Sequence, residues 1–378
     1  MHYFEYATKD TTLYEASQSL NSGLDEILEV RKDMNDSGTV IYVSRALIKF
    51  DLTYISSSIN SGLIKNPTYY LNLYDANSQG LNTSQKLYAF PVSQSWENGS
   101  GRLDSNPGIE DGAGWRWRDN STKRNQWNII SGSGGTWFSG SSGKYSLEAS
   151  QSFTHEAADV RMDVTDIVNN WIYSGSSYAN EGFMLKRSGS IGNTDSGSND
   201  AEGNTTQYGK FSFFSRETHT VYQPKLEVVW NDSKWATGSL SALSSTNLED
   251  MVFYMKGFRP EYKESSKVKF RVVGRERFPE KSYSATDQYQ TGYTTAKYLP
   301  SGSTYYQIKD SYTEEVIIPF GSGSVISCDS TGNYFNFWMN GLQSERFYKI
   351  QYKVVSGSGT ADETIQFFDE KHSFKVTR

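Results

Sequence analysis

A single stretch of helical periodicity stands in a chain whose other apolar residues mostly alternate as they do in β-strands. In that stretch the apolar positions fall at i, i+3, i+4 and i+7, the stripe of a two-turn helix, and they are Val164, Ile167, Val168 and Trp171. Asp163 stands where an N-cap belongs, and Asp166 three residues later completes a pair that is similar to a capping box. In the block RALIKFDL (residues 45–52), by contrast, apolar and mixed positions alternate with the period of a half-buried strand. The sequence therefore predicts an all-β chain with one short helix near residues 163–172.

The order of three blocks resembles that of the DNRLRE family of β-sandwich modules. They are RALIKFDL (residues 45–52), RMDVTDIVNNW (161–171) and NEGFMLK (180–186), and YQPKLEVVW (222–230) is similar to the family's last strand. The resemblance covers about residues 5–231 and implies a jelly-roll-like or carbohydrate-module-like sandwich. Such modules occur in secreted and cell-surface proteins, often beside carbohydrate-active domains, and in virion proteins of tailed phages. The fold is implied more firmly than any function, because one fold serves many functions.

The length of 378 residues predicts two domains, since a single hydrophobic core stops growing at roughly 250–300 residues. We expect the first antiparallel β-sandwich at 1–232, a Ser/Thr/Ala/Gly-rich linker at 233–245, and a second sandwich at 246–378. About seven alternating segments in the last part are typical of an immunoglobulin-like fold. The aromatic content of 15% fits thin cores between two sheets, because each ring buries roughly 150–250 Å².

Several classes of protein are disfavoured by composition. Cys328 is the only cysteine, so no disulfide can form within the chain, which favours folding in a reducing compartment. The first residues, MHYFEYATKD, lack the basic start and apolar core of a signal peptide, and no window is apolar enough to span a membrane. The net charge of −6 comes from residues 1–232, since residues 246–378 hold 17 Lys and Arg against 16 Asp and Glu. An acidic first domain disfavours binding of nucleic acid.

Catalytic and metal-binding patterns are sparse in this sequence. The four histidines do not have metal-ligand spacing, and no nucleophile or phosphate-loop motif is present. The carboxylates of Glu110, Asp111, Asp195 and Asp200 lie in polar insertions that promise no shielded pocket, whereas a general acid needs one. We therefore expect no enzymatic activity and no cofactor. A structural calcium ion in the acid- and Asn-rich stretch 193–204 stays a minor alternative.

Two long glycine-rich insertions, 96–143 and 188–209, are candidates for recognition, because loops of such length are usually functional or disordered. The first carries the aromatic and basic residues Trp115, Trp117, Trp127, Trp137, Arg116 and Arg118. The flat indoles suit stacking on sugars, and aromatic residues with Arg also favour the centre of a subunit interface. A third interpretation is that the tryptophans hold the loop against its own sandwich. We favour the subunit interface over the glycan.

A basic face is predicted in the second domain, where Lys267, Lys269 and Arg271 alternate with apolar residues and so share one side of a strand. Lysines on an exposed sheet face commonly guard against aggregation. Docking onto an acidic protein surface is the alternative.

Together these features favour a non-enzymatic virion structural protein of a tailed bacteriophage. Segments such as TYYQIKDSYTEEVIIPF in residues 250–378 also look similar to structural proteins of contractile-tailed phages. We expect such a protein to decorate or connect head, neck or tail in several copies or as a homo-oligomer, in contact with other virion proteins. The alternatives are a carbohydrate-binding adhesion module that recognises a host-surface glycan and an accessory domain pair of a polysaccharide-degrading enzyme.

Overall fold

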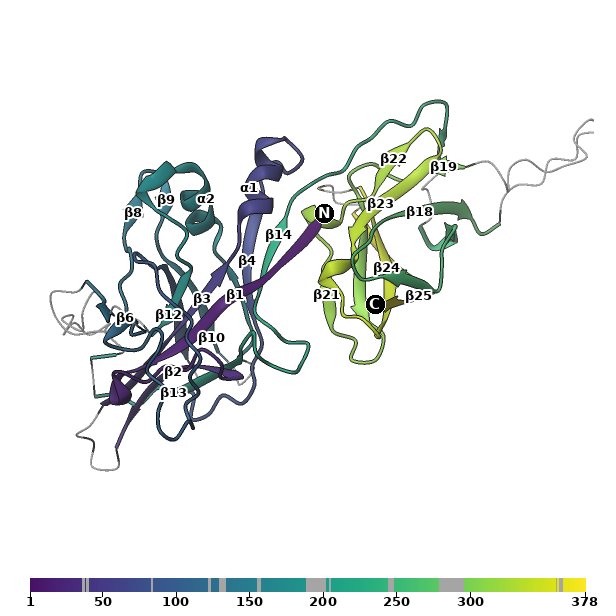
Figure 1. Ribbon diagram of the computed structural model, residues 1–378. Helices are drawn as coiled ribbons and strands as arrows, with labels where there is room; N and C mark the ends of the chain where they lie inside the picture. Colours follow the sequence, from purple (N-terminus) through teal and green to yellow (C-terminus); the bar gives the residue numbers. More distant parts are fainter. Residues whose placement is uncertain are drawn as a thin grey trace, which may run out of the picture. The chain divides into compact units, whose positions relative to one another are not determined.

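The chain forms two compact units in a computed structural model that describes residues 1–35, 38, 41–82, 84–121, 124–128, 134–154, 158–187, 202–203, 205–243, 248–278, 296–357, 359 and 363–378. The N-terminal unit comprises Glu5–Ser61 and Thr68–Val228. The C-terminal unit comprises Met1–Phe4, Gly62–Pro67 and Val229–Arg378. Both units are built mainly of strands (Figure 1), so the all-β prediction is confirmed.

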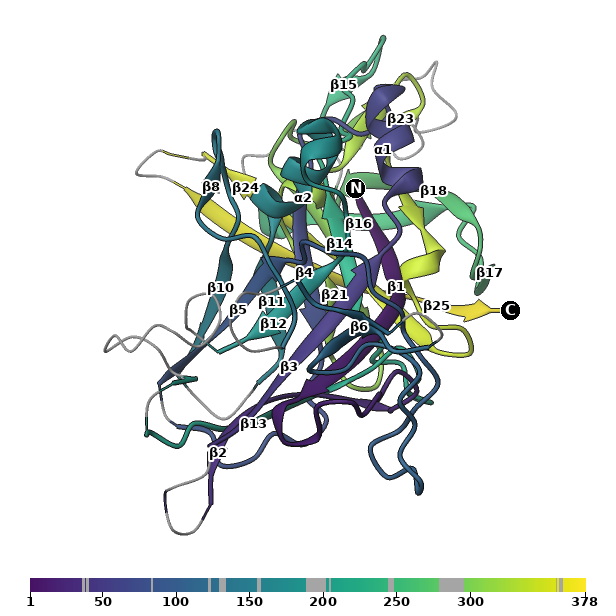
Figure 2. The same ribbon diagram turned by 60° about the vertical axis from the view of Figure 1, so that its left-hand side comes forward.

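The N-terminal unit contains one continuous ten-stranded sheet. Its main path runs β10-β5-β12-β3-β1-β14-β4-β11, and β2 and β13 extend it from β3. Figure 2 shows β2, β3 and β13 as neighbours, in agreement with their antiparallel pairing. The two ends of the path approach each other, because the Gln151 side chain on β10 accepts a hydrogen bond from the backbone of Arg161 on β11, at 2.9 Å. The sheet is therefore curled rather than flat. The strands are β1 (His2–Tyr14), β2 (Ile27–Met34), β3 (Ile41–Phe50), β4 (Thr68–Leu73), β5 (Gln85–Pro91), β10 (Ala149–Phe153), β11 (Val160–Asp163), β12 (Phe183–Lys186), β13 (Gly209–Phe214) and β14 (Lys225–Val229).

Short elements join these strands. Two small hairpins are formed by β6 (Trp117–Asp119) with β7 (Asn125–Gln126) and by β8 (Ser141–Ser142) with β9 (Tyr145–Ser146). The helices are α1 (Thr53–Asn60) and α2 (Thr165–Tyr173), with 3-10 turns at η1 (Glu15–Ser17) and η2 (Gly175–Ser177).

Helix α2 confirms the helix that the periodicity predicts, and Trp171 on it is buried against Phe183, with ring centres 4.8 Å apart. The predicted start of the helix is wrong by one residue. Val164 occupies the N-cap position, and the carboxylate of Asp163 accepts a hydrogen bond from the backbone of Thr165 at 2.9 Å. Asp166 does not complete a capping box, because it accepts from the backbone of Ser146 at 3.0 Å.

A second helix, α1, was not predicted, so the expectation of one helix in the first domain is wrong. It begins where the Asp51 carboxylate accepts hydrogen bonds from the backbone and hydroxyl of Thr53, at 2.9 and 2.6 Å. Leu52 and Ile55 are buried on one side of it. The run of serines in its sequence, TYISSSIN, hides this pattern, since serine competes with helix formation through local hydrogen bonds.

The C-terminal unit is a sandwich of two sheets. A six-stranded sheet has the order β15-β19-β18-β23-β22 with β16 beside β18, and a five-stranded sheet has the order β17-β25-β24-β20-β21. Its long strand pairs are antiparallel, as predicted, and two short pairs are parallel, β15 with β19 and β17 with β25. The strands are β15 (Ser241–Ala242), β16 (Met251–Lys256), β17 (Glu261–Lys263), β18 (Lys267–Glu276), β19 (Lys297–Tyr298), β20 (Thr304–Asp310), β21 (Val316–Ile318), β22 (Ser327–Asp329), β23 (Gly332–Trp338), β24 (Phe347–Ser356) and β25 (Thr364–Thr377).

The core of this sandwich is rich in aromatic residues from both sheets. Tyr306 on β20 stacks on Phe335 on β23 with ring centres 3.9 Å apart, and Phe253 on β16 stacks on Tyr352 on β24 at 5.1 Å. Such pairs contribute roughly 0.5–1.5 kcal/mol each beyond the apolar area that they bury. Among its described residues the unit also contains the 3-10 turns η4 (Leu248–Asp250), η6 (Ser322–Ser324) and η7 (Met339–Gly341).

The C-terminal unit takes up residues from outside the predicted segment 246–378. Of the residues expected as a linker, 233–245, the described ones, 233–243, belong to it: Cys328 donates a backbone hydrogen bond to Lys234 at 2.8 Å, and β15 pairs with β19. Residues 244–245 lie outside the described residues. The first four residues belong to it as well. Phe4 is buried in the sandwich core and packs against Gly341. The Phe4 ring lies so close to this glycine that no side chain would fit at position 341. The amino group of Met1 hydrogen-bonds the carbonyl of Trp230 and lies 3.0 Å from Asp232 Oδ1.

Candidate functional site

Three of the four tryptophans predicted as a recognition surface lie in the interior of the N-terminal unit. Trp115, Trp127 and Trp137 are 3%, 5% and 6% exposed and share a core cluster with Trp96. An indole that is buried in its own unit offers no face to a sugar or to a second subunit. For these three residues the prediction of an interface or glycan contact is therefore wrong, and packing within the chain takes its place.

Buried charges occupy the indole faces. The guanidinium of Arg45 lies 4.8 Å from the Trp115 ring centre and 5.0 Å from that of Trp137. Lys186 Nζ lies 4.7 Å from the same Trp137 ring. Both cations pair with Glu202, whose Oε2 lies 2.7 Å from Arg45 Nη2 and 3.1 Å from Lys186 Nζ. Burial of Glu202 would raise its pKa, but the two cations outweigh this effect and hold the pKa below its usual value. Through this buried cluster, residue 202 of the second insertion is fixed against the tryptophans of the first insertion. Most of that second insertion, 188–201 and 204, lies outside the described residues, including Asp195, Asp200 and most of the calcium candidate 193–204.

The remaining residues of that prediction stay partly accessible but are tied to the same unit. Trp117 is half-buried and donates from its indole nitrogen to Ser19 Oγ at 3.3 Å. Arg116 is exposed and lies over the Trp117 ring at 5.2 Å. Arg118 donates to the carbonyl and hydroxyl of Ser95, at 2.9 and 3.0 Å. One accessible ring with one cation is a weak basis for a glycan site.

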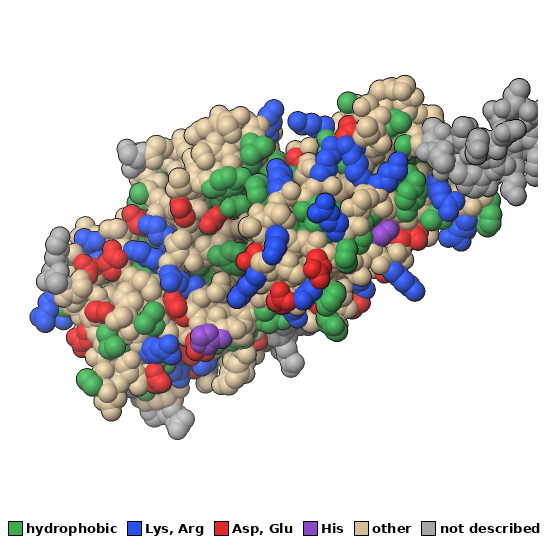
Figure 3. Space-filling model, turned by 45° about the vertical axis from the view of Figure 1, so that its right-hand side comes forward, with side chains coloured by type: hydrophobic (Ala, Val, Ile, Leu, Met, Phe, Trp, Pro, Cys, Tyr) green, Lys and Arg blue, Asp and Glu red, His purple; other side chains and the backbone are tan. Residues whose placement is uncertain are grey.

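The predicted basic face exists, and much of its charge is already paired. Lys267, Lys269 and Arg271 lie on β18 and all three pair with β23, whereas the pairing of β18 with β16 on the other side begins only at Arg271. Among the described residues, Lys267 and Lys269 therefore lie on a stretch of the strand that is paired on one side only. Lys269 and Arg271 both bind Asp329, at 2.9 and 2.6 Å, and Lys267 lies 4.9 Å from the centre of the Trp338 ring. Figure 3 likewise shows Lys and Arg side chains interspersed with acidic and hydrophobic ones on the face that it presents. An acidic partner would have to compete with Asp329 for this surface.

The acidic candidates do not form a shielded pair. Glu110 is exposed, and Asp111 accepts hydrogen bonds from the backbone and the hydroxyl of Ser100, at 2.9 and 2.5 Å. Within the part of the chain that the structure describes, no three His, Cys, Asp or Glu side chains gather in a way that would hold a metal ion. No helix among the described residues has the length and apolar character that crossing a bilayer requires.

A groove of about 770 Å³ lies in the N-terminal unit beside α1, α2 and the end of β3. Its charged groups are already engaged. Lys49 pairs with Glu181 at 2.7 Å, and the hydrogen bonds from Thr53 hold the pKa of Asp51 below its usual value. Besides these engaged charges, the groove is lined by hydroxyl and amide groups and by apolar side chains such as Leu52 and Ile172.

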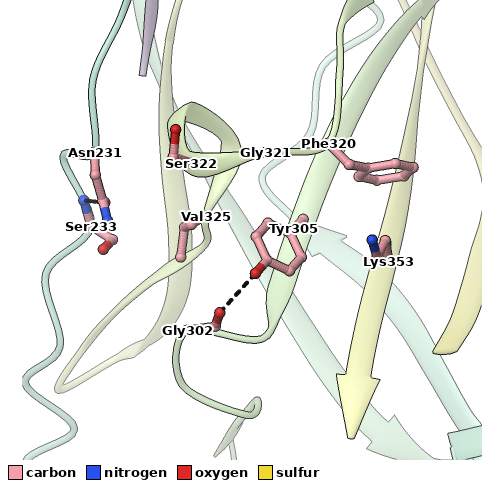
Figure 4. Close-up of a pocket in the computed structure, with 9 residues that line it drawn as sticks. All are labelled: Asn231, Ser233, Gly302, Tyr305, Phe320, Gly321, Ser322, Val325 and Lys353. Atoms are coloured by element: carbon pink, nitrogen blue, oxygen red, sulfur yellow. Dashed lines mark hydrogen bonds between the residues drawn. The ribbon is translucent and has the colours of Figure 1, made fainter. Parts of the chain in front are cut away.

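The C-terminal unit holds a pocket that the sequence did not single out, here termed the aromatic pocket. It has a volume of about 430 Å³, within the range of small-ligand sites, and is lined by Asn231, Ser233, Gly302, Tyr305, Phe320, Gly321, Ser322, Val325 and Lys353. Figure 4 shows Asn231 and Ser233 on the side opposite Phe320 and Lys353, with Tyr305 between them. The pocket combines two half-buried rings, one ammonium group and several small polar groups.

Local hydrogen bonds fix the walls of the aromatic pocket. The Tyr305 hydroxyl donates to the carbonyl of Gly302 at 3.0 Å, drawn as a dashed line in Figure 4. Ser324 stabilises the loop that carries Phe320, because its side chain is fully buried and its hydroxyl donates a hydrogen bond to the carbonyl of Pro319 at 3.0 Å. Phe320 also packs on Phe367 with ring centres 5.7 Å apart. The rings are thus positioned before any ligand arrives.

No model of a known protein family matches the chain, and no curated protein is similar to it in sequence. The resemblance to DNRLRE modules and the suggested phage setting therefore stay predictions.

Proposed function

We propose that this chain is a non-enzymatic structural protein of a tailed-bacteriophage virion, which decorates or connects the head, neck or tail in several copies. The resemblance of the N-terminal blocks to virion and surface modules supports the setting. An apolar surface on the C-terminal unit supports a role in assembly, because exposed apolar patches often mark sites of protein–protein interaction.

That surface, here termed the edge patch, consists of Tyr312, Val316 and Phe347. Their exposed fractions are 78%, 43% and 42%. The Tyr312 and Phe347 rings meet edge to face with centres 6.4 Å apart, and Ser311 donates a backbone hydrogen bond to Phe347 at 2.9 Å. Clustered exposed apolar residues mark interaction sites more often than isolated ones do.

The position of the edge patch favours a second copy of this chain as the partner. Val316 begins β21, which is the last strand of its sheet in the described part of the chain. An edge strand with apolar neighbours can pair with its own symmetry copy, which extends the sheet across a two-fold axis. Assembly through β21 is thus the contact that we assign to the proposed function.

Mass spectrometry of purified phage particles that encode this chain tests the setting. We expect the chain among the stoichiometric components of washed particles, and its absence from them would refute the virion proposal.

Light scattering of the purified chain tests the contact. Val316→Lys should shift the chain towards the monomer, because a charge on an edge strand opposes pairing. Ile365→Lys is the matched control, since Ile365 is 47% exposed on β25 and lies outside the edge patch. An oligomer that Val316→Lys leaves intact would contradict the assigned contact.

A further inference from the structure

Lys353 stands at the centre of an aromatic surface on the five-stranded sheet. It lies directly opposite Tyr305 on β20 and Phe367 on β25, so the three side chains leave the same face of the sheet. Its ammonium nitrogen lies 5.5 Å from the centre of the Tyr305 ring and 6.0 Å from that of Phe320. Phe367 is 61% exposed and extends this surface beyond the aromatic pocket.

The charge of Lys353 has no acidic partner among the described residues, whereas a neighbouring lysine has one. Lys349 lies four residues earlier on β24, on the same face, and pairs with Glu314. No described carboxylate makes such an ion pair with Lys353. A half-buried ammonium group without a carboxylate partner can form an ion pair with an anionic ligand.

The other groups of the aromatic pocket suit a sugar ring. The faces of Tyr305 and Phe320 carry negative partial charge, which attracts the C–H groups on the apolar side of a pyranose. Ser233, Ser322 and Asn231 line the pocket and supply hydroxyl and amide groups for hydrogen bonds to sugar hydroxyls. Because local hydrogen bonds fix the rings, binding would require little ordering of the protein.

We propose that the aromatic pocket binds an acidic sugar residue of a polysaccharide, with its carboxylate on Lys353 and its ring against Tyr305 and Phe320. The carboxylate would accept a charge-assisted hydrogen bond from the ammonium group. This inference goes beyond the assembly role and does not depend on it, since the aromatic pocket and the edge patch share no residue.

An acidic peptide fits this place less well. Peptides that bind β-sheets usually add a strand to a free edge. The strands beneath the aromatic pocket are inner ones, because β20 pairs with β21 and β24, and β24 pairs with β20 and β25. Their backbone groups are therefore committed to the sheet, and only side chains face the ligand.

Binding of carboxylated oligosaccharides to the full chain tests the proposal. Isothermal titration would compare tri-galacturonate, a glucuronate-containing trisaccharide and sialyl-lactose with neutral partners, namely the methyl ester of each. We expect at least one acidic probe to bind with a Kd of about 1 mM or tighter and its ester to bind at least about 10-fold more weakly. Lys353→Gln and Tyr305→Ala should each weaken that binding about 10-fold, and saturation-transfer NMR should place the ring protons of the sugar against aromatic side chains.

Lys349→Gln is the matched control, since it removes a lysine from the same face of the same strand but outside the aromatic pocket. It should leave the affinity unchanged, and circular dichroism should show that all variants fold. Failure of all three acidic probes to bind would overturn the proposal. Equal affinity for the methyl esters, or for a tri-glutamate peptide, would overturn the assignment of an acidic sugar in the same way.

Discussion

Arg45 and Glu202 form an ion pair that is closed off from water: Nη2 and Oε2 lie 2.7 Å apart, and the side chains are 0% and 1% exposed. The two residues are 157 positions apart in the sequence. Lys186 shares the same carboxylate, so two buried cations pair with one anion, while the faces of Trp115 and Trp137 cover the charges. The arrangement turns a tryptophan-rich insertion into part of the core.

Glu202→Gln should destabilise the N-terminal unit strongly. The substitution removes the carboxylate that Arg45 and Lys186 share, and breaking a buried pair on one side costs about 3–5 kcal/mol. Chemical denaturation followed by tryptophan fluorescence would measure the free energy of unfolding. Glu97→Gln is the matched control, because Glu97 pairs with Lys9 at 3.0 Å but is 58% exposed, and such pairs contribute about 1 kcal/mol or less. Equal effects of the two variants would contradict the structural role of the buried pair.

Trp171→Ala should cost roughly 3–5 kcal/mol, because it removes a large side chain from the core between α2 and β12. Trp117→Ala serves for comparison and should cost clearly less, since Trp117 is only half-buried. Urea unfolding of both variants against the wild type would decide the matter. A small effect at Trp171 would mean that α2 is not packed as described.

The stability of the N-terminal unit should fall as pH rises from about 4 to about 7. Burial raises the pKa of Asp10 to about 7, although the backbone of Arg216 donates to its carboxylate at 2.6 Å. The unfolded chain releases this proton near pH 3.8, so the folded state is favoured at low pH and loses that advantage as pH rises through 7. Burial also raises the pKa of Asp25, to about 6, which acts in the same direction.

Asp10→Asn isolates this effect, because the amide keeps an acceptor for Arg216 and never ionises. The variant should match the wild type near pH 4 and exceed it at pH 8 by up to a few kcal/mol. Thermal melts at pH 4.5, 6 and 8 would show the trend. A variant that is less stable than the wild type at pH 8 would refute the buried, ionisable state of Asp10.

Asp329→Asn tests the basic face. Hydrogen bonds from Arg271, and also from Thr331 and Lys269, hold the pKa of Asp329 far below its usual value. The carboxylate therefore contributes stability above pH 4 that fades as pH falls towards the lower folded-state pKa. Because the side chain is 29% exposed, we expect a loss of about 1 kcal/mol at neutral pH and low salt, and a smaller one in 1 M salt. No salt dependence would argue against these ion pairs.

Local pattern was sufficient for some elements and not for others. The apolar stripe that ends at Trp171 predicted α2, because the residues that show both the helical spacing and the buried side lie within two adjacent turns. The serine-rich α1 was not predicted, since only Leu52 and Ile55 mark its buried side and the hydrogen bonds of Asp51 at its start resemble those of an ordinary turn.

The sites were harder to predict because they depend on contacts between distant residues. Alternation places Lys349 and Lys353 on the outer face of β24, but only the fold reveals that Glu314 reaches the first and not the second. Likewise, the sequence around Trp115 contains no pattern that predicts its contact with the distant Arg45. A usable signal for the aromatic pocket does exist, namely the aromatic residue Tyr305 on the face of β20 that also carries Gln307 and Lys309.

The burial of Phe4 in the C-terminal sandwich has a consequence for the order in which the chain matures. Residues 1–4 leave the ribosome long before the strands that enclose them, and Met1 meets its partner Trp230 across 229 positions of sequence. The start of β1 must therefore wait, unpaired on this side, until synthesis has passed Gly341. During translation residues 1–4 are therefore among the last to reach their native contacts, although they are made long before the strands that enclose them.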